Sequence, residues 1–274
     1  MKKLLPHIRL PLSKIKYISL WLGILLYLVF SLSFTEEKRK NTICSEIRVQ
    51  VVDSLSDRFV TDDNIKDFVH DLDMKILGEP FKNVNIRELE RYLNARDDVR
   101  EAEAYFTADG TLYLQIDQRN PVVRVINNGG QSFYIDDEGV IMPLSESYSS
   151  HVLIASGEIN EFSEVVAKDR LNCPGANGDE PDHQMCEIYE LATFIHGDSF
   201  WKSQIEQIYL NHEGWYELIP RVGGHLILFG EFEDYREKFR NLKAFYKKGL
   251  NNVGWNQYMK INLKYDNQII CTKR

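Results

Sequence analysis

The sequence predicts an α+β protein with a single N-terminal transmembrane helix, a small strand-helix-helix-strand-strand domain and an antiparallel β domain with flanking helices. Three observations lead to this prediction. An uncharged segment near the N-terminus has the length of a membrane span, two amphipathic helical patterns follow one alternating strand pattern, and many short strand patterns then recur between turn residues. With 43% hydrophobic and 27% charged residues, the composition is that of a folded protein.

The charges of the N-terminus differ from those of the rest of the chain. Residues 1–16 contain five of the 33 Lys and Arg residues and none of the 41 acidic residues. Residues 17–35 carry no formal charge, and as a helix they would extend about 28 Å, close to the thickness of the hydrocarbon core. Since basic residues favour the cytoplasmic side, we expect a cytoplasmic tail over 1–16, a transmembrane helix over 17–35 and an exported C-terminal part.

A cleaved signal peptide is the main alternative for this segment. The stretch Ser31-Leu32-Ser33 supplies small residues at the positions that signal peptidase reads. A buried helix of a soluble protein would show a polar face, which this segment lacks. A lipoprotein is disfavoured because Cys44 follows Thr42-Ile43 instead of small residues. We therefore expect an uncleaved helix in the membrane.

Residues 44–118 predict a small domain. The patterns indicate, in order, a strand from Ile47, a helix after Thr61, a helix after Asn85, and strands at Val99 to Phe106 and Thr111 to Asp117. Asn85 with Glu88 three residues later is typical of a capping box. The residues Ala108-Asp109-Gly110 suit a tight hairpin turn. This domain carries no nucleophile or carboxylate pair arranged for chemistry, which favours a binding module.

A second domain is expected over 121–274, after the break at Asn120-Pro121. Its predicted strands are Val122 to Ile126, Ser132 to Ile135, Gly139 to Met142, Val152 to Ala155, Ile205 to Asn211, Trp215 to Pro220, His225 to Phe229 and Tyr258 to Tyr265. Two helices are predicted among them, from about Glu187 to His196 and from about Asp234 to Leu250. The short strands and frequent turns favour an antiparallel sheet, with the last strand at its edge.

The cysteines leave two interpretations open. Cys173 and Cys186 bracket a polar loop, and in an exported chain a disulfide can close such a loop. The alternative is a Cys/His metal site that includes His183, but the paired short spacing of structural zinc modules is missing.

Charge and motifs argue against several functions. The net charge of −8 disfavours binding to a phosphate backbone, so no nucleic-acid partner is expected. The seven histidines are scattered, and the sequence lacks H-E-x-x-H, G-x-S-x-G and a glycine-rich phosphate loop. The stretch Asp136-Asp137-Glu138-Gly139 is typical of a turn and lacks the twelve-residue spacing of a calcium loop. We expect neither an enzyme nor a cofactor.

Several motifs resemble the bacterial cell-division family FtsQ, also called DivIB. They are Gln118-Arg119-Asn120-Pro121, Phe133-Tyr134-Ile135-Asp136-Asp137-Glu138-Gly139, Met142-Pro143-Leu144 and Ile261-Asn262-Leu263-Lys264-Tyr265-Asp266-Asn267-Gln268. The last stretch is similar to the C-terminal strand motif of that family. The resemblance implies a POTRA domain followed by a β domain, in a non-catalytic scaffold of the divisome that helps regulate septal peptidoglycan synthesis. It also implies an inner-membrane location at the septum, with the C-terminal domains in the periplasm.

The resemblance also implies partners and site residues. In the family, an FtsB strand adds to the last β-strand, and FtsL-type proteins and other divisome components bind as well, the latter through the POTRA domain. The matching positions are Lys264, Tyr265, Asn267 and Gln268, where strand addition would combine main-chain hydrogen bonds with alternate side-chain contacts. Lys264 stands where the family usually has arginine. A lysine cannot form the bidentate hydrogen bonds of a guanidinium with a carboxylate, so that contact is not expected in this chain. Tyr265 has an alternative, structural role in packing on the preceding helix.

A different class of function shares the small domain. POTRA domains also occur in envelope proteins for export or outer-membrane assembly, which usually carry repeats of the domain or a membrane barrel. The sequence shows a single such unit, and helices interrupt its later strands. We therefore expect the divisome scaffold, with the export or assembly factor as the alternative.

Overall fold

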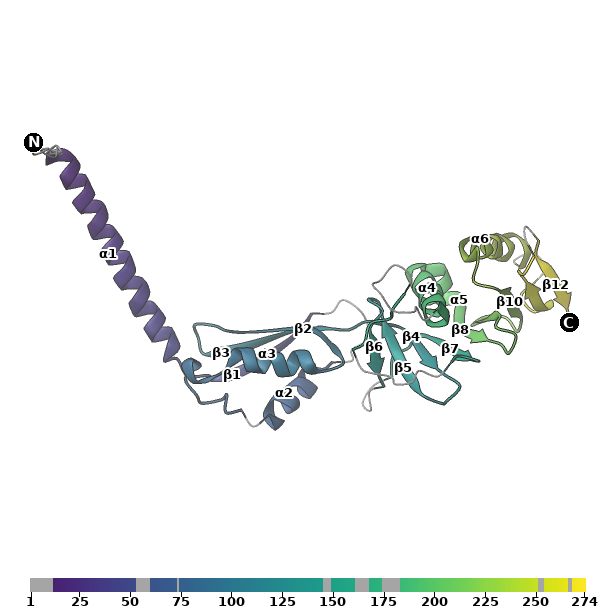
Figure 1. Ribbon diagram of the computed structural model, residues 1–274, viewed down its shortest axis with the longest axis horizontal. Helices are drawn as coiled ribbons and strands as arrows, with labels where there is room; N and C mark the ends of the chain where they lie inside the picture. The colour runs from purple at the N-terminus through teal and green to yellow at the C-terminus, as the bar shows by residue number, and fades with distance from the viewer. Residues whose placement is uncertain are drawn as a thin grey trace, which may run out of the picture. The chain divides into compact units, whose positions relative to one another are not determined.

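The chain forms two compact units with separate sheets (Figure 1). The computed structural model describes residues 12–52, 60–72, 74–144, 149–160, 168–173, 183–250, 254–265 and 268–274. The first unit comprises residues 1–50, 62–93 and 102–116, and the second comprises 51–61, 94–101 and 117–274. The expected α+β class is confirmed.

The small sheet belongs to the N-terminal part of the chain. Its elements in order are β1 (Glu46–Val52), α2 (Asp62–Asp71), the short 3₁₀ helix η1 (Phe81–Asn83), α3 (Ile86–Ala95), β2 (Val99–Phe106) and β3 (Thr111–Gln118). The strand order is β1-β3-β2. Alternate residues of β3, such as Leu112, Leu114 and Ile116, are fully buried, as expected for a strand with one face against helices. The predicted element order is confirmed.

Local sequence signals explain both helices of this part. In α2, Ile65 and Val69 are buried one turn apart, and Asp62 and Asp63 lie in the first turn, where the helix dipole favours acidic residues. Before α3, the Oδ1 atom of Asn85 accepts from the Glu88 backbone N–H at 3.3 Å, and the Asn85 side-chain amide donates to the Glu88 carboxylate at 3.1 Å. The predicted cap is therefore formed.

Helix α1 (Leu12–Lys40) precedes the small sheet and includes residues 17–35. Judged on the residues that the structure describes, no helix has both the length and the apolar character needed to cross a membrane.

The second sheet has nine strands. Its elements in order are β4 (Pro121–Ile126), β5 (Ser132–Asp136), β6 (Ile141–Pro143), β7 (Leu153–Gly157), α4 (His183–Gly197), α5 (Ser199–Gln204), β8 (Ile205–Leu210), β9 (Tyr216–Pro220), β10 (Leu226–Gly230), α6 (Tyr235–Phe245), the π-helical turn η2 (Tyr246–Leu250), β11 (Tyr258–Asn262) and β12 (Ile270–Lys273). The strand order is β12-β11-β10-β9-β8-β7-β4-β5-β6.

The prediction of an antiparallel sheet is wrong, because the sheet is mixed. The pairs β4–β7, β7–β8 and β10–β11 are parallel, and the other five are antiparallel. A parallel pair needs a crossover connection. Helices α4 and α5 provide it between β7 and β8, and α6 with η2 provides it between β10 and β11.

The core of the second unit lies between this sheet and its helices. Inward residues of the central strands, including Val123, Ala155, Ile208 and Leu218, join one buried cluster with α4 and α6. The ring centroids of Trp201 on α5 and Phe239 on α6 lie 4.9 Å apart, so the two helical segments share a single aromatic core.

Helix α5 was missed by the sequence analysis. The Asp198 carboxylate accepts from the backbone N–H groups of Phe200 and Trp201 at 2.8 and 3.3 Å, which caps its first turn. Because α5 has only six residues, it has no helical periodicity to detect. Helix α4 also begins at His183, four residues before the predicted start.

The two family-like motifs around Arg119 and Asp136 meet at the start of the large sheet. The Arg119 guanidinium donates to the Asp136 carboxylate at 2.8 Å, and the Asp136 side chain is completely buried. The same carboxylate accepts from the backbone N–H groups of Glu138 and Val140 at 2.9 and 2.7 Å. The backbone N–H of Asp137 also donates to the carbonyl of Asn120 at 2.9 Å. One carboxylate therefore joins the entry to β4 with the β5–β6 turn.

We expect Asp136→Ala to lower the free energy of unfolding by about 3 kcal/mol, because it leaves the Arg119 charge and two backbone donors without their acceptor. Urea denaturation of the full chain measures the loss. Glu138→Gln is the matched control, since Glu138 lies 3.9 Å from Arg119 with a half-exposed side chain. The control should change the unfolding free energy by less than about 0.5 kcal/mol. Equal stability of both variants would contradict a structural role for the buried pair.

Candidate partner-binding edge of the large sheet

Strand β12 is the outer strand at one end of the nine-stranded sheet. It pairs antiparallel with β11, with Ile261 opposite Cys271 and Asn262 opposite Ile270. Among the described residues no strand pairs with its other side, so this side presents main-chain N–H and C=O groups to solvent. The side chain of Ile270 is 46% exposed there. This edge can accept an added strand.

The opposite edge of the sheet is covered. Along β6, the Ile141 N–H donates to the Asp169 carbonyl at 2.8 Å, and the Lys168 N–H donates to the Ile141 carbonyl at 2.9 Å. Val140 and Arg170 form an antiparallel bridge next to these bonds. Residues 168–171 therefore occupy the N–H and C=O groups of Ile141 at the start of β6, where a partner strand would pair.

The predicted site residues lie in the connection between β11 and β12. The predicted strand through Tyr265 ends at Asn262. Lys264 and Tyr265 follow it, Gln268 precedes β12, and Asn267 lies outside the described residues. The Gln268 N–H donates to the Tyr265 carbonyl at 3.3 Å, and this hydrogen bond links the two ends of the β11–β12 connection. The structure thus brings Lys264, Tyr265 and Gln268 to the end of the open edge.

Lys264 is held in place by Trp215 and Gly230. Its ammonium nitrogen lies 3.0 Å from the centroid of the Trp215 ring, a cation–π contact, and its backbone N–H donates to the Asn262 side chain at 2.9 Å. Gly230 has a φ of +82°, and a Cβ atom there would lie 3.0 Å from Cγ of Lys264. Only glycine combines this backbone conformation with room for the lysine stem.

Tyr265 and Leu263 have opposite environments. Leu263 is buried, and its N–H donates to the Leu228 carbonyl at 2.9 Å, so the chain is fixed to β10 at this point. Tyr265, two residues later, is 55% exposed. The tyrosine therefore leaves most of its ring available to a partner instead of packing fully on the preceding helix.

The end of β12 is attached to a buried histidine cluster that the sequence analysis did not identify. The Arg274 guanidinium donates to the Gly224 carbonyl at 2.8 Å, next to the buried His225. Nε2 of His225 lies 2.8 Å from the Tyr246 hydroxyl, and Trp255 also borders the imidazole. Burial, together with the positive charge of Arg274, lowers the pKa of His225. No short-range sequence pattern relates these five positions.

Cys173 and Cys186 form a disulfide, with their Cα atoms 5.5 Å apart. Their sulfur atoms are bonded to each other, so they are not metal thiolates in this structure. The disulfide interpretation is confirmed and joins the residues before the 174–182 loop to α4.

Together, the two sheets and the open strand edge define a two-part protein with a small β-α-α-β-β domain and a larger sheet domain. Comparison with family models identifies both parts. A model of a POTRA-like domain matches residues 42–117, and the model "FtsQ/DivIB, C-terminal related" matches residues 120–272. The chain belongs to the FtsQ/DivIB family, and it is an FtsQ-like cell-division protein. Proteins of this family are generally non-catalytic scaffolds. No curated protein matches the chain significantly.

The His225 cluster predicts a pH-dependent stability. In the unfolded chain the imidazole regains its usual pKa of about 6.5, whereas in the folded chain its pKa is lower. Below a pH of about 6.5 the unfolded chain therefore binds more protons at His225 than the folded chain does. The contribution of neutral His225 to the free energy of unfolding is fully present above this pH and is lost as the pH falls through it. Chemical denaturation from about pH 7.5 to 5 should record this loss.

His225→Gln should remove this part of the pH dependence. The exposed His212 provides the control, because His212→Gln leaves the buried cluster intact and should retain it. The same pH profile for His225→Gln and the unsubstituted chain would show that other groups cause the effect.

Proposed function

We propose that the chain is a non-catalytic, single-pass membrane scaffold of the bacterial divisome. In this proposal it binds FtsB-like and FtsL-like proteins by strand addition at the C-terminal edge of its sheet and helps regulate septal peptidoglycan synthesis. The observation that carries the proposal is the difference between the two edges: no described strand pairs with the outer side of β12, whereas residues 168–171 lie along β6. Membership of the FtsQ/DivIB family supports the choice of partner.

The proposed contact combines main-chain and side-chain recognition. A partner strand would lie beside Ile270–Lys273 and form the ladder hydrogen bonds that β12 lacks on its outer side. Tyr265 would supply an aromatic anchor at the start of this strand, and Lys264 a positive charge that orients an acidic partner. Asn267 and Gln268 complete the proposed site by family resemblance.

We propose that α1 anchors the chain in the cytoplasmic membrane. Supporting this, residues 17–35 carry no formal charge. The described large apolar side chains from Leu20 to Phe30 are also exposed, so they are not part of a hydrophobic core. The proposed order is a cytoplasmic tail over 1–16, an anchor over 17–35, a POTRA domain over 44–118 that binds other divisome components, and a β domain over 121–274, both in the periplasm.

We expect Tyr265→Ala to weaken binding of an FtsB-like partner at least tenfold, equivalent to about 1.4 kcal/mol, because a central aromatic side chain often supplies much of the binding free energy. A charge reversal, Lys264→Glu, should also weaken binding. Titration of the full chain with the partner measures both affinities, while thermal unfolding checks the fold.

Tyr209→Ala is the matched control for Tyr265→Ala. Tyr209 is also surface-exposed, but it lies on β8, a strand with neighbours on both sides. The control should bind the partner normally. Unchanged affinity of both edge variants would reject this surface as the binding site.

A full-length fluorescent fusion should fractionate with the membrane, retain its N-terminus and concentrate at the division septum. Replacement of Leu25 by Arg places a charge in the middle of the proposed anchor and should reduce retention in the membrane. Leu77→Arg is the control, since Leu77 is an exposed leucine outside α1. A mature N-terminus near Phe34 would contradict the anchor, and a uniform envelope signal would favour the export or assembly alternative.

A further inference from the structure

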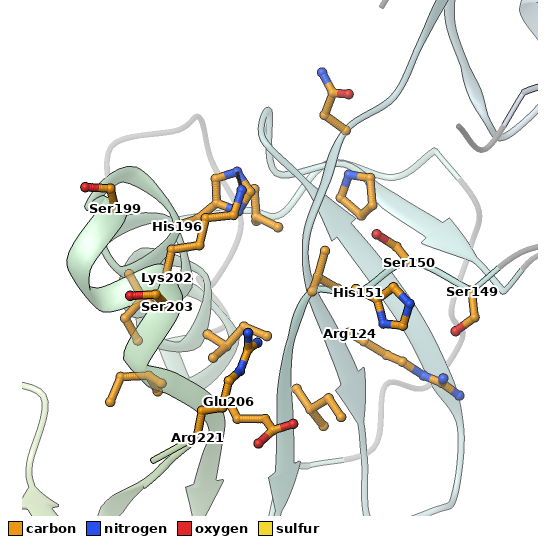
Figure 2. A pocket seen from close by; sticks show the side chains of 18 residues that line it. Arg124, Ser149, Ser150, His151, His196, Ser199, Lys202, Ser203, Glu206 and Arg221 are labelled. Carbon is orange, nitrogen blue, oxygen red and sulfur yellow. Dashed lines mark hydrogen bonds between the residues drawn. The ribbon is translucent and has the colours of Figure 1, made fainter. Parts of the chain in front are cut away.

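A cavity of about 790 Å³ lies on the second unit, and Figure 2 shows the side chains that line it. Its described lining comes from β4, from residues 149–154, from the end of α4 with α5 and the start of β8, and from Arg221 after β9. Strands β4, β7 and β8 each have neighbours on both sides. The cavity therefore opens over a region of the sheet whose main-chain groups are already paired.

The cavity has a positive lining in an acidic protein. Among its described lining residues, Arg124, Lys202 and Arg221 are cationic, and Glu206 is the one carboxylate. In the described part of the chain, none of these three cations forms an ion pair. The whole chain has a net charge of −8, so the charge of the cavity lining is opposite in sign to the net charge of the chain. Such a reversal favours an anionic ligand.

The buried Tyr134 organises one wall of the cavity. Its hydroxyl accepts from the Ser150 backbone N–H at 3.2 Å and lies 3.3 Å from Oγ of Ser149. Arg124 donates from Nε to Oγ of Ser132 at 3.0 Å, and its guanidinium lies 6.0 Å from the centroid of the Tyr134 ring. These contacts fix the strand-side wall of the cavity before a ligand arrives, which lowers the entropic cost of binding.

The opposite wall comes from the helical segment. Nζ of Lys202 on α5 lies 3.5 Å from Nε2 of His196, near the end of α4. Figure 2 shows His196, Lys202 and Ser203 on the helical side, with Arg124 and His151 on the strand side. Cationic and hydroxyl groups thus border the space from two directions.

We propose that this cavity binds a phosphate group of a small molecule or of a lipid headgroup. A phosphate has several oxygens that accept simultaneously from guanidinium, ammonium and hydroxyl donors, which matches Arg221, Lys202 and the serines of the lining. The cavity volume lies within the roughly 300–1,000 Å³ of small-ligand sites. An acidic peptide strand fits less well, because β4, β7 and β8 have no free edge for it. This site is separate from the proposed strand addition.

Calorimetric titration of the full chain at low salt tests the site with two soluble probes. Inorganic pyrophosphate represents a free phosphate compound, and glycerol phosphate represents a lipid headgroup. We expect saturable binding of at least one probe, and the tighter one identifies the source. Lys202→Gln and Arg221→Gln should each weaken binding at least tenfold, because each removes a charge that contacts the ligand.

Lys66→Gln is the matched control, since it removes one exposed lysine on α2, in the other unit. It should bind the probe like the unsubstituted chain. Three results would overturn the proposal: no saturable binding of either probe, an equal loss in the Lys66→Gln control, or binding of a hexaglutamate peptide in place of both phosphate probes.

Discussion

The ion pair of Arg119 and Asp136 is the constraint on which the large sheet depends. The Asp136 side chain is fully buried and pairs with the Arg119 guanidinium. It also accepts hydrogen bonds from two backbone N–H groups of the β5–β6 turn, so it holds both the charge and the turn in place. It fixes where the chain enters β4, and β4 in turn pairs with β5 and β7. A buried charge pair adds little net stability, yet it penalises any arrangement that separates the two groups.

Local signals made much of the fold predictable. The cap of Asn85 with Glu88 and the spacing of Ile65 and Val69 act over three or four residues, and both predicted helices form there. The parallel strand pairs were not predictable, because they depend on where α4 and α6 return the chain. The path of such a crossover depends on tertiary packing, and the periodicity of a strand does not predict it.

The site was predictable only in part. Resemblance directed attention to Lys264 and Tyr265, and their position beside the sheet edge follows from the terminal strand pattern. The contact of Lys264 with Trp215 was not predictable, since about fifty positions separate the two residues and no spacing rule relates them. The cavity with the cationic lining was also missed, because its cations come from β4, from α5 and from the residue after β9, and none forms a motif with its neighbours.

The covered β6 edge has a consequence for self-association. A sheet with two open edges can add copies of itself head to tail, and such a contact repeats without closing. With residues 168–171 along β6, that route is blocked at one end. Two chains that meet through β12 alone would form a closed, two-fold pair and stop there. Among the described residues, the large sheet can therefore present one open strand edge at high local concentration without a route to a filament through its own two ends.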